Sequence, residues 1–226
     1  ATYGYKDYFT LNANTRYDGS NKFGSRSNEK LLPVWSVSGL VDLKTVSGLQ
    51  LSWLESFSVK GSYGEQGNML DGQTPVLVLK KGSYSDYRDE MISTVASGGF
   101  ANPNLKWEKT RSYNLGAMAS VFKNSLMINF EYYYKKTTDM VVQQEVPLEN
   151  GVVSRAINGG EMKNSGWDAT ISFTPWRSKD WLLTLGFNFG KVNNKVNSTL
   201  EPNGRWQEAA SGNLNKEGYA VSSFWA

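Results

Sequence analysis

Apolar and polar residues alternate along most of the chain, with the period of two that is typical of β-strands whose two faces meet different surroundings. Between Leu126 and Tyr134, for example, every second residue is apolar or aromatic, and Asn129 and Glu131 lie on the other face. Apolar stripes with a helical period are hard to find. The alternation predicts the end of one strand at 2–5 and about seven full strands, at 9–18, 35–43, 57–63, 112–121, 126–135, 167–174 and 183–189.

These predicted strands differ from those of an ordinary soluble sheet. Three of them cover ten residues, whereas soluble strands usually have about 5–6 and a tilted membrane-spanning strand needs about 9–11. The second face is small and polar, and it carries the clear mid-strand charges, which are Arg16, Lys60, Glu131 and Asp168. The pattern therefore predicts an all-β fold, the wall of an antiparallel transmembrane β-barrel, with the apolar face toward lipid and the polar face toward the lumen.

The connections between the predicted strands alternate in length. Tight connections at 5–8, 123–125 and 175–180 contrast with long ones at 18–30, 66–106 and 137–159. Outer-membrane barrels have short periplasmic turns and long extracellular loops, so this alternation orients every strand. With that orientation, the apolar faces all end in an aromatic residue on the extracellular side, namely Tyr17, Trp35, Tyr63, Tyr113, Tyr134, Trp167 and Phe189. Aromatic rings prefer the membrane–water interface, which supports the orientation.

Composition narrows the possible functions. The 226 residues contain neither cysteine nor histidine, which excludes disulfides, thiol and histidine catalysis, and the commonest metal ligands. The net charge of +3 is too small to indicate nucleic-acid binding. We expect no catalytic residue, no metal and no cofactor, and therefore no enzyme.

The organisation of the chain is that of a single unit. It opens within an aromatic, strand-like run without Met or a basic leader, so we expect a piece of a longer protein. No linker divides it, and residues 1–226 are interpreted as one partial transmembrane β-barrel domain. No helix is predicted. Within the long connection 66–106, the apolar segment Thr74–Leu79 is a candidate for a short strand.

Few motifs suggest chemistry. Ser27–Lys30 matches the S-x-x-K pattern of Ser-Lys acylases, but the partner motifs of those enzymes are absent. Glu131 and Asp168 could form a pair of catalytic carboxylates, although ion pairs with Lys60, Lys135 or Arg16 are the favoured interpretation. Aromatic residues in the loops could stack on a sugar or peptide, or pack the loops together; they are Tyr84, Tyr87, Phe100, Trp107 and Trp206.

Several segments resemble the SusC/RagA family of TonB-linked (TonB-dependent) outer-membrane transporters. The most telling is Asn102-Pro103-Asn104-Leu105-Lys106-Trp107-Glu108-Lys109-Thr110, which runs into Tyr113-Asn114-Leu115-Gly116. The segments 5–24, 33–36, 61–68, 132–139 and 158–167 match in the same order. The resemblance therefore spans nearly the whole chain.

This resemblance implies a barrel of about 22 strands with an N-terminal plug, of which the chain supplies part of the C-terminal half. It also implies the cell outer membrane of a Gram-negative bacterium, a SusD-like surface lipoprotein as partner, TonB as a partner of the missing N-terminal region, and uptake of glycans or peptides. Plug, TonB box and terminal strand do not match any part of this sequence, so no ligand-contacting residue can be assigned beyond the weak loop candidates. The alternative is a soluble β-sandwich glycan-binding module, similar to a lectin, which the aromatic content and the mean hydropathy of −0.47 also allow.

Overall fold

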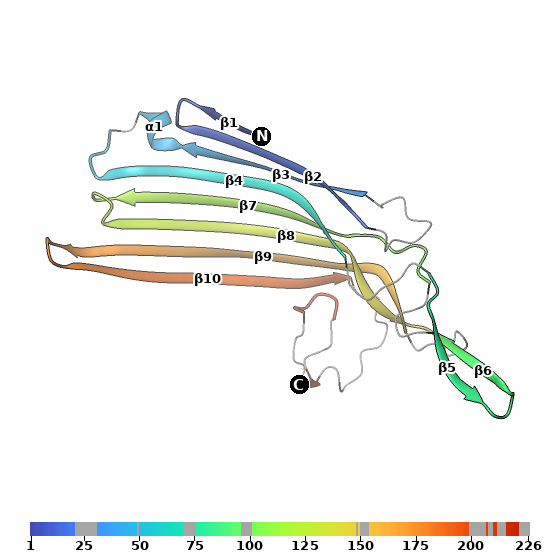
Figure 1. Cartoon of the computed structure of the whole chain (residues 1–226). Helices are drawn as coiled ribbons and strands as arrows, with labels where there is room; N and C mark the ends of the chain where they lie inside the picture. Colours follow the sequence, from blue (N-terminus) through green and yellow to red (C-terminus); the bar gives the residue numbers. More distant parts are fainter. Residues whose placement is uncertain are drawn as a thin grey trace.

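A computed structural model of the chain describes residues 1–20, 31–48, 50–69, 76–95, 101–147, 149, 154–198, 207, 210–211 and 216–221. In the described part of the chain the named elements are ten strands and one short helix (Figure 1). In chain order they are β1 (Thr2–Tyr5), β2 (Phe9–Gly19), β3 (Leu31–Asp42), α1 (Leu43–Ser47), β4 (Leu54–Asn68), β5 (Leu79–Ser85), β6 (Glu90–Val95), β7 (Glu108–Val121), β8 (Leu126–Glu145), β9 (Ser154–Arg177) and β10 (Leu182–Ser198).

Eight of the strands form one antiparallel sheet in the order β1-β2-β3-β4-β7-β8-β9-β10. Strands that follow one another along this sheet are neighbours in the chain as well, apart from the step from β4 to β7. The sheet is open in the described residues, because β1 and β10 lie at opposite edges (Figure 1). The predicted all-β, antiparallel barrel-wall fold with about eight strands is confirmed.

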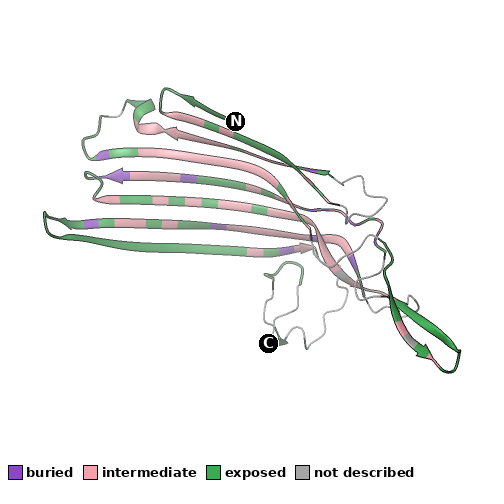
Figure 2. Ribbon diagram, in the orientation of Figure 1, coloured by how far each residue is buried: buried purple, intermediate pink, exposed green. Residues whose placement is uncertain are grey.

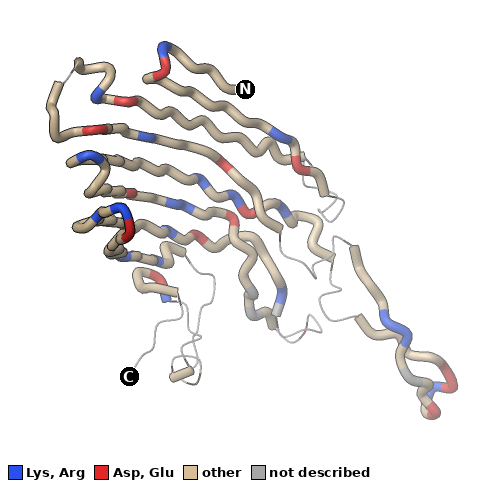
Figure 3. The backbone as a smooth tube through the Cα atoms, turned by 60° about the vertical axis from the view of Figure 1, so that its left-hand side comes forward, with Lys and Arg blue, Asp and Glu red and all other residues tan. Residues whose placement is uncertain are grey.

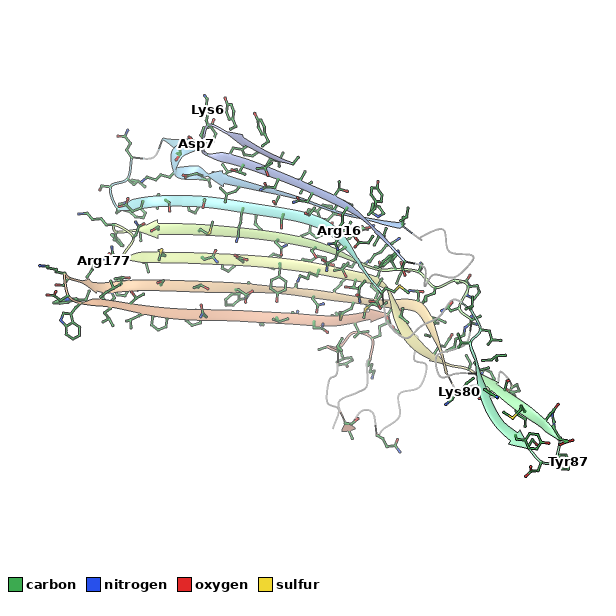
Figure 4. All side chains as sticks on the ribbon, in the orientation of Figure 1. Lys6, Asp7, Arg16, Lys80, Tyr87 and Arg177 are labelled. Atoms are coloured by element: carbon green, nitrogen blue, oxygen red, sulfur yellow. The ribbon has the colours of Figure 1, made fainter. Side chains whose placement is uncertain are left out.

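The two ends of the sheet differ in the way predicted. Lys6, Asp7 and Arg177 lie at the end with the tight turns, whereas Tyr87 lies far beyond the opposite end (Figure 4). Lys6 and Asp7 have φ angles of 47° and 60°, the left-handed conformation that closes a tight hairpin between β1 and β2. Charged residues gather toward both ends of the strands, and the stretches between carry few (Figure 3).

The expectation of no helix was wrong at residues 43–47. Residues 43–47 form a single helical turn, α1, between β3 and β4. The Asp42 side chain accepts hydrogen bonds from the backbone N–H groups of Lys44 and Thr45, at 3.1 and 3.3 Å, and Gly48 ends the turn with a φ of 65°. One turn is too short for a helical period to show in the sequence.

The expected boundaries of the long connections also needed correction. The connection predicted at 137–159 is largely strand, because β8 and β9 continue to pair as far as Glu145 and Ser154. In the connection 66–106, the short strand begins where the predicted segment Thr74–Leu79 ends: β5 starts at Leu79 and pairs with β6. This β5–β6 hairpin is a sheet of its own and projects beyond the end of the main sheet (Figure 1).

Buried residues are few, and most of the sheet is exposed or intermediate (Figure 2). The one apolar cluster among the described residues lies at the long-loop end, where Leu32 and Trp107 pack together with Val34 and Met69. Gly67 lies beneath this cluster, and a Cβ atom there would come within 2.0 Å of Leu32. The core therefore anchors the loops, while both broad faces of the sheet remain uncovered.

Candidate functional site

The outward, apolar face of the sheet is continuous across the strands. Ile128 on β8 is the Cα partner of Ile171 on β9, and Phe130 is the partner of Ala169. Partner residues in antiparallel strands direct their side chains to the same face. Ile128, Phe130 and Leu185 retain 39%, 44% and 41% exposure, since no second layer of the described chain covers them. The predicted sharing of one apolar face by these residues is confirmed.

The aromatic ends of this face contact one another across the strands. Trp35 packs edge-on against Tyr63 with ring centroids 5.1 Å apart, and Tyr63 stacks on Tyr113 at 4.5 Å. Tyr113 in turn lies 6.1 Å from Tyr134. Four of the seven rings predicted to end the apolar face therefore contact one another in sequence across β3, β4, β7 and β8, and the seven positions together define the aromatic line.

This aromatic line crosses the sheet diagonally. From β2 to β10 the sheet has six pairs of neighbouring strands. In four of these pairs, the aromatic residue of the second strand lies two residues closer to the tight turns than the Cα partner of the first strand's aromatic residue. The line therefore descends by eight residues in total. Eight residues extend about 27 Å along a strand, and the six distances between neighbouring strands add up to about 29 Å across the sheet. If the line marks one membrane surface, the strands tilt by about 40° from the membrane normal, within the range of outer-membrane barrels.

Above the aromatic line, the same face becomes charged. Glu65, Arg111, Lys136 and Lys163 are successive Cα partners on β4, β7, β8 and β9. Arg111 pairs with Glu65 at 2.7 Å. Sequence reasoning missed these residues because it stopped at the aromatic positions; following the alternation two residues further on each strand would have found most of them.

Glu161 lies within the same charged region. It accepts a hydrogen bond from Asn197 at 2.7 Å and pairs with Lys136 at 3.0 Å, while Lys163 lies 4.0 Å away. The hydrogen bonds from Asn197 and Lys136 lower the pKa of the Glu161 carboxyl from its ordinary value. Glu161 is therefore ionised at neutral pH and offsets part of the positive charge around it.

The inward face carries one row of long charged side chains over small residues. Lys60, Gly116, Glu131 and Asp168 are successive Cα partners on β4, β7, β8 and β9. Lys60 crosses β7 and reaches Glu131 at 2.5 Å. A Cβ atom at Gly116 would lie 2.6 Å from Cε of Lys60, so glycine leaves the path that the lysine needs.

The expected ion pair between Lys60 and Glu131 is thus present. The other two cations expected to pair with Glu131 or Asp168, which are Arg16 and Lys135, have different partners. Arg16 pairs with Asp18 at 2.9 Å, and the ammonium of Lys135 lies 5.7 Å from the centre of the Tyr133 ring. Glu131 also accepts a hydrogen bond from Asn129 at 3.3 Å. A shallow groove of about 400 Å³ runs beside this row. The surface suits contact with water or polar groups.

The motif that carries most of the family resemblance ties the loops to the end of the sheet. Asn102 donates a hydrogen bond to the carbonyl of Ala156 at 2.8 Å, and Asn158 exchanges two hydrogen bonds with the backbone of Lys106, at 2.9 and 3.0 Å. Glu108 accepts one from the N–H of Val141 at 2.8 Å. These polar side chains replace backbone pairing where the chain enters β7, and their role is structural.

The loop aromatics proposed as ligand contacts have different surroundings. Tyr84 and Tyr87 lie on the β5–β6 hairpin, with 51% and 97% exposure, and the Tyr84 hydroxyl donates to Asp89. Trp107 is only 7% exposed in its contact with Leu32, so it packs the loop base and offers no open ring face. Phe100 and Trp206 lie outside the described residues, as does the S-x-x-K segment 27–30. A ligand role for Tyr84 and Tyr87 stays a prediction.

Two other features are absent from the described part of the chain. No helix there is long and apolar enough to cross a membrane. No group of three or more His, Cys, Asp or Glu side chains is placed to hold a metal ion in that part of the chain.

Comparison with known proteins connects these features to a family. A family model described as "TonB dependent receptor-like, beta-barrel" matches residues 1–222. TonB-dependent receptor P3 of Formosa agariphila is 28% identical over 99% of this chain, which covers 23% of that protein. TonB-dependent receptor SusC of Bacteroides thetaiotaomicron is 26% identical over 93% of the chain, or 22% of its own length.

Solved structures agree with the sequence relatives. The RagAB peptide transporter superimposes with a TM-score of 0.81 and 27% identity, covering 96% of this chain and 24% of that one. The RagAB peptide importer in its closed-closed state superimposes with a TM-score of 0.78 and 28% identity, covering 89% of this chain and 22% of that one. The chain thus spans about a quarter of the length of its relatives. It belongs to the TonB-dependent receptor β-barrel family and resembles SusC and RagA within it.

Proposed function

We propose that this chain is one partial barrel domain, residues 1–226, in the wall of an outer-membrane importer of large nutrients. The observation that carries the proposal is the aromatic line, which bounds an uncovered apolar face at the tilt of a membrane-spanning barrel. The wall has no catalytic role: it encloses a polar lumen through which the substrate passes. The remaining strands close the barrel, because open edges in lipid leave backbone groups unpaired.

The substrate is a glycan or a peptide, in keeping with relatives named SusC and RagAB peptide importer. A SusD-like lipoprotein caps the extracellular end, and TonB acts through a region N-terminal to this part of the barrel wall. The β5–β6 hairpin extends from the extracellular end, with Tyr84 and Tyr87 exposed, and it approaches the lipoprotein or the ligand.

The topology is tested by inserting an epitope tag into the full-length transporter at either end of the sheet. A tag at Tyr87, on the hairpin, should bind antibody on intact cells. A tag at Asn124, in the tight turn between β7 and β8, should bind only after the outer membrane is opened. Heat-modifiable gel migration of both proteins is the control for folding.

Reversed labelling would overturn the orientation. A tagged protein that fractionates as a soluble monomer, with no detergent requirement, would instead support the soluble β-sandwich module. The structure does not favour that alternative, because no second sheet covers the apolar face in the described part of the chain.

A further inference from the structure

A basic patch lies on the outward face just above the aromatic line. We define it by Arg111, Lys136, Lys163 and Lys191. Arg111 and Lys136 are two residues beyond Tyr113 and Tyr134 on their strands, about 7 Å further from the membrane centre along the strand axis.

The other two members continue the patch onto the neighbouring strands. Lys163 is the Cα partner of Lys136, and Lys191 is the partner of Trp167, itself one of the aromatic ends. The acidic side chains that pair with the patch are Glu65 and Glu161, so four positive side chains face two negative ones. The patch retains a net positive charge at the level where lipid headgroups lie.

An apolar hollow lies below the patch on the same face. Gly39 and Gly61 are Cα partners, and neither supplies a side chain. The walls of the hollow include Val37, Tyr113, Leu115 and Tyr132. Gly61 lies four residues below Glu65 on β4, or about 14 Å along the strand. A hollow in a lipid-facing surface is filled by lipid, and an acyl chain matches its apolar lining.

We propose that the basic patch and the hollow together bind one phosphorylated glycolipid of the outer leaflet. Phosphate oxygens accept charge-assisted hydrogen bonds from Arg111, Lys136 and Lys163, as guanidinium and ammonium groups donate to phosphate. An acyl chain of the same lipid occupies the hollow between Gly39 and Gly61. Neither the polar lumen nor the substrate path is involved. The inference rests on the membrane placement proposed above.

The test uses the full-length transporter in detergent, titrated with bis-phosphorylated lipid A and followed by native mass spectrometry. The first variant combines Lys136→Gln, Lys163→Gln and Lys191→Gln. Its matched control combines Lys6→Gln, Lys123→Gln and Lys179→Gln, which removes the same charge at the turn end. We expect affinity to fall on the order of a hundredfold in the first variant, and less than threefold in the control.

Three further measurements separate the possible sources of binding. Replacing the three patch lysines by arginine should retain lipid A binding, because the charge remains. Gly61→Val, which fills the hollow and keeps every charge, should weaken binding about threefold. Inorganic phosphate at millimolar concentration should not displace the lipid, since it lacks the acyl chain.

Equal affinity of the patch variant and the control would overturn the proposal, as would equally tight binding of a fully dephosphorylated lipid A. Displacement by inorganic phosphate would show a simple anion site and contradict the lipid assignment. Heat-modifiable migration of each variant reports on the barrel independently. Failed lipid binding by a variant that still forms the barrel therefore refutes the lipid site alone, while an unsubstituted transporter that forms no barrel refutes the proposed function.

Discussion

The outward and inward faces of the sheet are made from alternate residues of the same strands, and they differ in what they can contact. On β8, Ile128 and Phe130 point outward and no described part of the chain covers them, whereas Glu131 points inward and pairs with Lys60. Glycine has a different effect on each face. Gly61 leaves an apolar hollow on the outward face, and Gly116 leaves space for the Lys60 side chain on the inward face. The difference is that between a lipid-facing and a water-facing surface.

This contrast explains why a chain with mean hydropathy of −0.47 can belong to a membrane wall. Only every second residue within the span has to be apolar, and the loops and the lumen face contribute polar residues. Beyond the aromatic line the outward face also carries charged residues. The apolar surface therefore forms a band that ends at this line on every strand that crosses it.

The largest effect is expected from isolating residues 1–226. In the described sheet β1 and β10 are edge strands, and in lipid each edge would expose unpaired N–H and C=O groups at several kcal/mol per group. The lumen face, rich in Ser, Asn, Thr and Gly, lacks the interlocking side chains that fill a small barrel. Refolding in detergent should therefore give aggregates. A monomer with a cooperative, heat-modifiable transition would show that the chain closes on itself.

The next effect comes from placing a charge on either face at the same depth. In the full-length transporter, Phe130→Arg should reduce the free energy of unfolding by about 2–4 kcal/mol, since it puts a guanidinium in the apolar band. Asn129→Arg, one residue away on the lumen face, should cost much less. Denaturant titration of the folded barrel in lipid vesicles measures both, with Phe130→Leu as the control for lost ring packing. Equal costs for the two arginines would mean that the assigned register is wrong.

The smallest effect is expected for the inward ion pair. Lys60 and Glu131 both retain 40% side-chain exposure, so water screens their attraction. Lys60→Gln should lower the free energy of unfolding by less than about 1 kcal/mol. A double-mutant cycle with Glu131→Gln isolates the pair, and Lys135→Gln, on the same face, is the control. Coupling of several kcal/mol would indicate a dry lumen at this depth and contradict a water-facing surface.

Sequence reasoning succeeded where one physical contrast repeats along a strand. Lipid on one side and water on the other impose the period of two, so the strands, their faces and the aromatic ends could be predicted. The outer half of the β8–β9 hairpin was missed because register shifts between Thr137 and Val141 interrupt the alternation there.

Other features depend on residues far apart in the chain. Trp107 could be taken for a ligand-stacking ring, and its burial follows from Leu32 and Gly67, which only the folded sheet brings beneath it. The Lys60–Glu131 pair could be anticipated as one of three alternatives, but the choice among them required the β4–β7–β8 strand order. The basic patch could have been predicted from the sequence, because the same alternation continues past the aromatic residues.

The central claim is that alternate residues of these strands face lipid and lumen, and a cysteine scan of β8 tests it most directly. The chain has no cysteine of its own, so single substitutions from Leu126 to Lys136 give unambiguous labels in a full-length transporter freed of any other cysteine. With an environment-sensitive dye in vesicles, a lipid-borne quencher should act at 126, 128, 130, 132 and 134. A water-soluble quencher should act at 127, 129, 131, 133 and 135 on the lumen face, and also at 136 on the outward face above the aromatic line. Uniform quenching along β8, or the opposite alternation, would contradict the account.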